Sequence, residues 1–181
     1  MSRAELLAQI AAEIRDRGVQ QIGIDGVDGA GKTCFADELA VELGDSTSRI
    51  RLDDFLNPTE VRYRLGRDSP QGFFVDSFDY DAFVAAIAPT AKPVVADGIF
   101  LHRDELRGLW DYSIWLDVPF ELSIPRGAAR GYGFGDPDPA APSNRRYVEG
   151  QRLYIMRCAP RTRATVVIDN SDLASPVRLQ A

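Results

Sequence analysis

The stretch GIDGVDGAGKT, residues 23–33, decides the fold that this sequence predicts. From Gly26 to Thr33 it follows the pattern G-x-x-x-x-G-K-[ST]. The residues before it, VQQIGID (19–25), are typical of a buried strand, and the residues that follow, KTCFADELAVELG (32–44), predict a helix. A glycine loop between a strand and a helix is the setting in which this pattern cradles phosphates. A plain glycine-rich turn is the alternative interpretation.

The residue types of this loop suit the phosphates of a nucleotide. Glycines let the backbone turn sharply so that several N–H groups point inward, and the start of the helix adds a partial positive charge. Lys32 adds a full positive charge, and it is one of only two lysines among the 21 basic residues. The predicted nucleotide-binding residues are Gly26, Asp28, Gly29, Ala30, Gly31, Lys32, Thr33 and Cys34.

Length and charge limit the classes of function. A chain of 181 residues suits one domain, predicted over 1–181. The net charge of −6 disfavours nucleic acid and anionic membranes as partners, and no apolar run reaches the ~18 residues of a membrane span. The N-terminus lacks the apolar core of a signal peptide, and the two cysteines lack metal-binding spacing. We expect a cytoplasmic protein with no nucleic-acid or membrane partner, and a homodimer stays open.

Apolar runs alternate with helical patterns along the chain. Because these runs are continuous rather than alternating, they favour a parallel sheet that is covered on both faces. The sequence therefore predicts an α/β fold with a doubly wound five-stranded parallel sheet. The predicted strands are 19–25, 48–52, 93–100, 112–118 and 164–170.

Carboxylates follow two of the predicted strands. Asp53 and Asp54, in RLDDFLNP, directly follow the strand predicted at 48–52, and Asp97 stands at the end of the apolar run in VVADGIF. Ligands of open parallel sheets collect at the carboxyl ends of the strands. Asp97 stands where a carboxylate holds magnesium through water, and the Thr33 hydroxyl is the second predicted metal ligand. Turn carboxylates without a ligand are the alternative.

Five motifs in order resemble the uridine kinase and phosphoribulokinase family of phosphate-loop kinases. They are GVDGAGKT, RLDDF, DSFDYDAF, VVADGI and YSIWLDV, which together cover most of residues 20–170. The resemblance implies a nucleoside-kinase-like fold with strand order 2-3-1-4-5, and ATP and Mg²⁺ as cofactors. It also implies that the γ-phosphate of ATP moves to a hydroxyl of a small molecule, the expected partner.

The resemblance also assigns roles to single residues. Asp53 matches the family's carboxylate that accepts the proton of the substrate hydroxyl, and Asp79 matches the one that binds sugar hydroxyls. Tyr80 and Arg62 complete the predicted substrate site. The family usually has glutamate where this chain has Asp97.

A stretch rich in arginine follows the fourth predicted strand. Residues 120–163 hold eight arginines and four acidic residues. Arg126 and Arg130 are spaced to share one helix face, as in the lid of the family, where such arginines contact the transferring phosphates. We predict a lid over about 126–146, with Lys32, Arg126, Arg130 and Asp53 as the catalytic residues. A solvated basic helix face is the alternative, and Pro125 complicates a continuous helix.

Two departures from the family bear on the acceptor. No hairpin that would hold a uracil ring fits between the helix at 80–88 and the strand at 93–100, and Leu56 stands where the family has tyrosine. The long polar and aromatic segment 53–81 also carries Arg62, Arg64 and Arg67. A nucleoside-monophosphate-type kinase, whose acceptor is a phosphate, therefore stays open. So does a nucleotide-binding module or ATPase without transfer activity.

Overall fold

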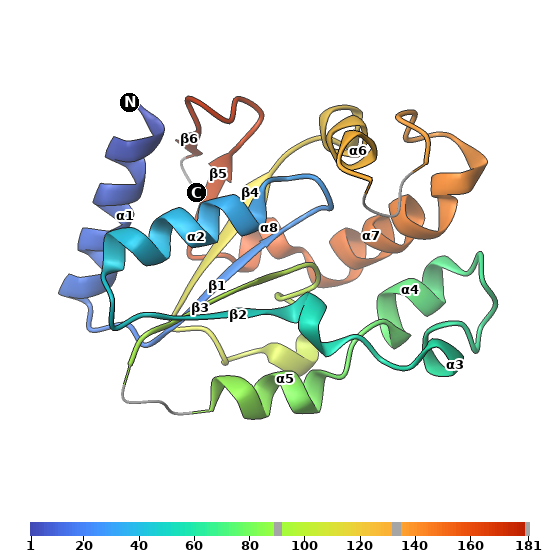
Figure 1. The fold of residues 1–181 in the computed structure, drawn as a ribbon, viewed down its shortest axis with the longest axis horizontal. Coiled ribbons are helices and arrows are strands. Elements are labelled where there is room, and N and C mark those ends of the chain that lie inside the picture. The colour runs from blue at the N-terminus through green and yellow to red at the C-terminus, as the bar shows by residue number, and fades with distance from the viewer. Residues whose placement is uncertain (89–91, 132–134, 180–181) are drawn as a thin grey trace.

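The sheet at the centre of the molecule has six strands (Figure 1). The computed structural model describes residues 1–88, 92–131 and 135–179. The strands follow the order β2-β3-β1-β4-β5-β6, and all neighbours are parallel except β5 and β6. They are β1 (Gln21–Gly26), β2 (Ser48–Arg51), β3 (Val94–Gly98), β4 (Tyr112–Asp117), β5 (Val166–Asp169) and β6 (Val177–Leu179).

The first five strands confirm the predicted parallel sheet and its order 2-3-1-4-5. The prediction of five strands was wrong by one, because β6 pairs antiparallel with β5 at the edge. This strand has only three residues, too few for a hydrophobic pattern to show. Its middle residue, Arg178, pairs with Glu13 of the first helix, so a contact between the chain's two ends holds the strand in place.

Helices cover both faces of the sheet. In Figure 1, α1 and α2 lie on one side of the sheet and α5 on the other. The α-helices are α1 (Arg3–Asp16), α2 (Lys32–Leu43), α3 (Thr59–Arg62), α4 (Pro70–Asp76), α5 (Tyr80–Ile87), α6 (Phe120–Ala129), α7 (Arg145–Cys158) and α8 (Pro160–Arg163). Short 3-10 turns span Leu52–Phe55, Asp104–Leu106 and Pro142–Asn144. None of the helices in the described ranges is long and apolar enough to cross a membrane.

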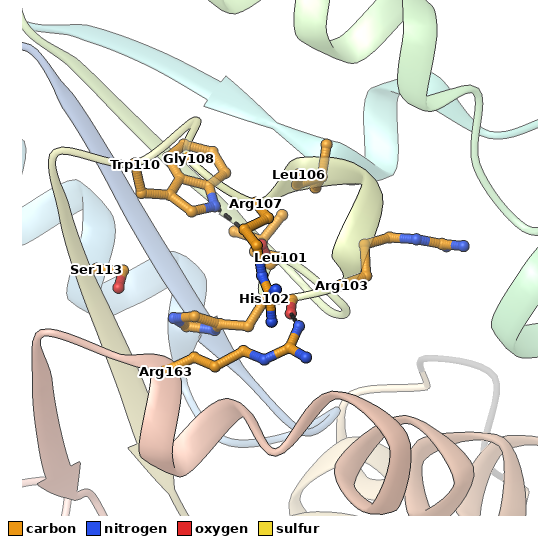
Figure 2. Close-up of a pocket in the computed structure, with 9 residues that line it drawn as sticks. All are labelled: Leu101, His102, Arg103, Leu106, Arg107, Gly108, Trp110, Ser113 and Arg163. Carbon is orange, nitrogen blue, oxygen red and sulfur yellow. Dashed lines mark hydrogen bonds between the residues drawn. The ribbon is translucent and has the colours of Figure 1, made fainter.

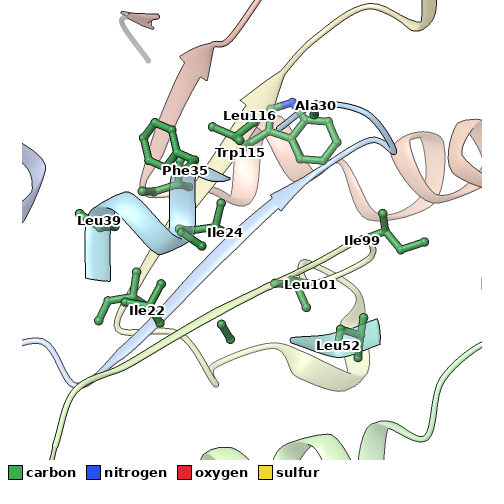
Figure 3. Packing of buried hydrophobic residues seen from close by; sticks show 14 of the residues in the cluster. Ile22, Ile24, Ala30, Phe35, Leu39, Leu52, Ile99, Leu101, Trp115 and Leu116 are labelled. Carbon is green, nitrogen blue, oxygen red and sulfur yellow. The ribbon is translucent and has the colours of Figure 1, made fainter. Parts of the chain in front are cut away.

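Strand β1 sorts its side chains between the two faces. Ile22 and Ile24 point towards α2, where Figure 3 shows them near Phe35 and Leu39. Because side chains alternate along a strand, position 23 faces the other way. Only glycine fits at position 23, since a Cβ there would lie 2.6 Å from the Trp110 ring. The same alternation sends Asp25 to the face away from α2.

Helix α7 holds the long segment after β2 in place. A Cβ on Gly150 would lie 2.8 Å from the Phe73 ring and 2.9 Å from the Pro70 carbonyl oxygen, so α4 and α7 pack at close range. The guanidinium of Arg146 donates to the carbonyl oxygens of Arg62, Gly66 and Ser69 at 2.9–3.3 Å. Residues 62–73 are thereby fixed to α7 by both packing and hydrogen bonds.

Candidate functional site

The glycine loop has a backbone that only glycines adopt without strain. Gly29 and Gly31 have φ of 77° and 89°, in the left-handed region. A Cβ on Gly29 would lie 2.0 Å from the Ser123 carbonyl oxygen, and one on Gly31 would lie 2.9 Å from the amide nitrogen of Asn170. The loop therefore closes tightly between β1 and α2, as the motif requires.

Lys32 begins α2 and turns back over the loop. Its ammonium donates to the Val27 carbonyl oxygen at 2.9 Å, so the charge lies across the turn instead of extending into solvent. A positive side chain, the start of a twelve-residue helix and a glycine backbone thus meet at one place. This arrangement fits the phosphates of a nucleotide.

The two predicted metal ligands are hydrogen-bonded to each other. The Thr33 hydroxyl donates to Asp97 Oδ2 at 2.8 Å. The other carboxylate oxygen of Asp97 accepts from Arg49 Nη2 at 2.7 Å, and Arg49 also donates to the Val95 carbonyl oxygen at 2.6 Å. One hydroxyl and one carboxylate suit Mg²⁺, which takes few protein ligands and completes its shell with phosphate and water. The sequence analysis missed Arg49, which β2 places beside β3.

Asp53 follows β2 in the 3-10 turn Leu52–Phe55. Burial against the surrounding protein raises the pKa of its carboxyl group, and the nearby charges of Asp97 and Asp54 raise it further, while Lys32 acts in the opposite direction. These interactions place the predicted base in the same electrostatic environment as the predicted metal carboxylate and the loop lysine.

Asp28 forms a second contact between the loop and the rest of the molecule. Its backbone N–H donates to Gln151 Oε1 at 2.7 Å, and Gln151 Nε2 donates to Asp28 Oδ2 at 3.2 Å. Burial raises the pKa of the Asp28 carboxyl group, Lys32 opposes this, and the charge of Asp53 adds to it. Gln151 was missed in the sequence, because nothing near position 151 marks it as a partner of the loop.

The predicted substrate residues have structural contacts. Asp79 caps α5, accepting the Ala82 N–H at 2.9 Å, and is exposed. The Tyr80 hydroxyl is buried, and the Arg103 guanidinium lies 3.9 Å from the centre of its ring. Arg62 donates to the Thr59 hydroxyl at 3.3 Å. Their roles in substrate binding stay predictions.

The predicted lid begins inside α6. Pro125 does not end this helix, which continues to Ala129. The Arg126 guanidinium donates to the carbonyl oxygens of Asn170 and Ser171, and Arg130 is the exposed C-cap residue. Residues 132–134 of the predicted lid and its hinge lie outside the described part of the chain. The catalytic roles of both arginines stay predictions.

A buried polar network lies behind the loop. Asp25 has no exposed surface, and its Oδ2 accepts from the backbone N–H of His102, from His102 Nδ1 and from the Tyr154 hydroxyl. Oδ1 accepts the Gly26 N–H at 2.7 Å, so the network reaches the first residue of the motif. Figure 2 shows His102 beside Arg163 in the wall of a cavity of about 230 Å³, which Trp110 also lines.

Comparisons with known proteins found similar structures only. No family model matches the chain, and no curated protein matches its sequence. One similar solved structure is described as a "Possible Uridine Kinase from Bacillus stearothermophilus", with a TM-score of 0.68 and 21% identity over 91% of this chain and 96% of that one.

A second similar structure is a "putative fructose transport system kinase from Silicibacter sp. TM1040". Its TM-score is 0.63, with 19% identity over 83% of this chain and 94% of that one. Both likenesses span nearly the whole of the compared chains. The chain therefore has the α/β fold of these two structures, built on a mostly parallel sheet.

Proposed function

We propose that this protein is an ATP- and Mg²⁺-dependent kinase that phosphorylates a hydroxyl group of a small molecule. The observation that carries the proposal is the convergence of Lys32 and Thr33, Asp97 and Asp53, from three parts of the chain, on the carboxyl edge of the sheet. Phosphoryl transfer needs these elements together: a cation at the phosphates, a place for the metal and a carboxylate near the attacking hydroxyl.

The residues divide the work of the reaction. Bound ATP and Mg²⁺ would supply the γ-phosphoryl group and neutralise much of its charge. Lys32 stabilises the negative charge that remains on the phosphates. Asp53 orients the acceptor hydroxyl and takes its proton as the oxygen bonds to the γ-phosphorus and the bond from that phosphorus to ADP breaks. A raised pKa serves this role, because the carboxylate is then a stronger base than that of an ordinary aspartate.

A non-nucleoside alcohol is the acceptor that these residues favour. Helix α5 ends at Ile87 and β3 begins at Val94, which leaves residues 88–93 for the connection, of which 89–91 lie outside the described ranges. A connection of this length does not supply a base-binding hairpin. The names of the two similar structures mention uridine and fructose, which both carry several hydroxyls. We expect uridine and cytidine to be poor acceptors here.

The experiment is an assay of ATP consumption with a panel of acceptors: uridine, cytidine, ribose, pantothenate, sugar alcohols and nucleoside monophosphates. Asp53→Asn is expected to lower turnover by ~10²–10⁴ with ATP binding close to normal. Lys32→Ala is expected to shrink the thermal stabilisation by ATP and Mg²⁺. Asp54→Asn is the matched control, because it changes the neighbouring carboxylate, and it is expected to turn over normally.

Three outcomes would refute the proposal or part of it. ATP hydrolysis that no acceptor accelerates would favour an ATPase or binding module. Preference for a nucleoside monophosphate would favour a phosphate acceptor. A uridine specificity constant far above all others would show that another segment holds the base.

The lid arginines have a test of their own. Arg126→Ala and Arg130→Ala are each expected to lower turnover more than ATP binding, because their charge matters most as the γ-phosphate moves. Normal rates in both variants would show that neither arginine contributes to phosphoryl transfer.

A further inference from the structure

Asp28 is an unexpected residue in a loop that fits phosphates. A carboxylate repels a phosphate group, and its own backbone N–H is not directed at one, since it donates to Gln151 Oε1 at 2.7 Å. Gln151 thus removes from the loop one of the N–H groups that such a motif would offer to the nucleotide. Asp28 must be explained by something other than phosphate binding.

Gln151 holds the Asp28 side chain in one orientation. Gln151 is buried, with 1% of its surface exposed. Its Nε2 donates both to Asp28 Oδ2 at 3.2 Å and to the Tyr147 carbonyl oxygen at 3.1 Å, so the amide cannot turn over without losing these bonds. One oxygen of the carboxylate is fixed by this amide. Asp28 as a residue is half-buried.

Asp28 interacts electrostatically with two charged residues of the predicted site. Its carboxylate interacts with Lys32 and with the predicted base Asp53. Two neighbouring carboxylates repel each other, and burial makes the charged form of Asp28 costlier still. Hydrogen-bond donors from a ligand would relieve both penalties.

Aromatic side chains lie around Tyr147, whose carbonyl oxygen accepts from Gln151. The Tyr147 hydroxyl interacts electrostatically with Tyr63, Asp28 and Arg62, which places all three near it. The Tyr147 ring packs edge-on against Phe73, with centroids 5.0 Å apart. Carboxylates beside aromatic rings suit a molecule with hydroxyls and apolar C–H faces.

We propose that Asp28 binds a second hydroxyl of the acceptor while Asp53 binds the hydroxyl that is phosphorylated. The acceptor is then a polyol, such as a sugar or sugar alcohol, and Gln151 is the positioning residue that aims Asp28. This assignment rests on the proposed kinase function. It differs from the role that the resemblance gives to Asp79, which here caps a helix.

The test compares Asp28→Asn with the wild type on a matched pair of acceptors, ribose and 2-deoxyribose. A hydrogen bond to a charged group contributes about 1.5–3 kcal/mol, which corresponds to roughly 10–150-fold in affinity. We expect Asp28→Asn to raise the KM for ribose by that factor and the KM for ATP less than twofold. In the wild type the KM for 2-deoxyribose should exceed the KM for ribose, and this difference should vanish in Asp28→Asn. Asp81→Asn is the control, because Asp81 is an exposed carboxylate of α5 outside the predicted site, and it should leave the ribose KM unchanged.

Gln151→Met separates positioning from direct contact. It keeps the side-chain length but removes both hydrogen bonds to Asp28, so it should raise the KM for ribose without changing the KM for ATP. The double variant with Gln151→Met and Asp28→Asn should have the same KM for ribose as Asp28→Asn alone. Circular dichroism checks that both variants fold. Equal effects on ATP and ribose, or a 2-deoxyribose penalty that persists in Asp28→Asn, would overturn the assignment.

Binding measurements separate this inference from the proposed function. Calorimetry with ribose, fructose and ribitol, in the presence of Mg²⁺ and a non-hydrolysable ATP analogue, needs no phosphoryl transfer. Polyol binding that Asp28→Asn weakens, without transfer in the wild type, would refute the kinase function and support the Asp28 assignment. Transfer to an alcohol with a single hydroxyl, and no binding of any polyol, would support the kinase function and overturn the assignment.

Discussion

Asp25 and Asp28 are two carboxylates three positions apart that differ in burial, in hydrogen bonding and in the charges near them. Asp25 directly precedes Gly26 and Asp28 follows it by two positions, and α7 contacts both carboxylates, through Tyr154 and Gln151 respectively. Asp25 is completely buried and accepts hydrogen bonds on both oxygens. Asp28 is partly exposed, accepts from the Gln151 amide and interacts unfavourably with the charge of Asp53.

The difference teaches how to separate a structural carboxylate from a functional one. A buried carboxylate whose oxygens accept from several buried donors stabilises the fold, because most of those donors would otherwise lack a partner. A carboxylate that is partly desolvated and placed near a like charge costs free energy in the absence of a ligand. Removing the Asp25 carboxylate should therefore lower the free energy of unfolding, whereas removing the charge of Asp28 should raise it.

Asp25→Ala should have the largest effect. It leaves the Gly26 N–H, the His102 ring and the Tyr154 hydroxyl without their acceptor, while the His102 backbone N–H keeps the Tyr154 oxygen as its partner. Because each buried unsatisfied donor costs roughly 1–3 kcal/mol, the free energy of unfolding should fall by about 4 kcal/mol, measured by urea denaturation. If this variant does not fold, Tyr154→Phe tests the same network with an expected loss of about 1.5–3 kcal/mol. Unchanged stability of Tyr154→Phe would contradict a structural role for Asp25.

Gly150→Ala should have the next largest effect, at the helix that contacts both carboxylates. Its Cβ would overlap the Phe73 ring and the Pro70 carbonyl oxygen, so we expect about 1–3 kcal/mol of destabilisation from overpacking. Gly135→Ala is the matched control, because nothing lies within 4 Å of its Cβ. Equal effects of the two substitutions on the urea midpoint would show that α4 and α7 separate easily.

Asp28→Asn should stabilise the protein without ligand. The folded protein raises the pKa of Asp28, so it pays a cost for the charged form that the unfolded chain does not. Below the ordinary aspartate pKa of 3.8 the group is protonated in both states and the variant gains nothing. The gain builds up as the pH rises from 3.8 to the folded pKa and stays constant above it. Thermal unfolding at neutral pH should show a Tm no more than about 2–4 °C higher, the shift for roughly 1 kcal/mol at this size.

The pH dependence of activity should show the smallest effect. The acid limb of kcat/KM is expected at a pKa above 3.8, because burial and the charges of Asp97 and Asp54 raise the pKa of Asp53. Asp54→Asn removes one of those charges and should move the midpoint to lower pH by less than about one unit. A midpoint that moves upward would mean that another group limits the rate.

The loop and the sheet could be predicted from the sequence. The residues that give the glycine loop its conformation lie within 26–33. Their effect depends on their own backbone conformation or on the start of the helix that follows. The order of the first five strands was implied by the resemblance, and the structure confirms it. The predicted pair Thr33 and Asp97 is also found in contact.

Other parts of the site could not be predicted. Gln151 is 123 positions from Asp28, and Tyr154 is 129 positions from Asp25. Neither residue stands in a local pattern that marks its partner, and Arg49 reaches Asp97 only because β2 lies beside β3. Strand β6 was missed for a similar reason, since its position depends on pairing with β5.

The sequence by itself determined the local elements: the capping box of α1, the strand–loop–helix unit around Lys32 and the apolar strands of the sheet. These depend on backbone preferences and on neighbours within a few positions. Only the tertiary structure decided that Asp25 is saturated and Asp28 is not. That distinction depends on which side chains of α7 face the loop, and it arises from packing between segments that are more than a hundred residues apart.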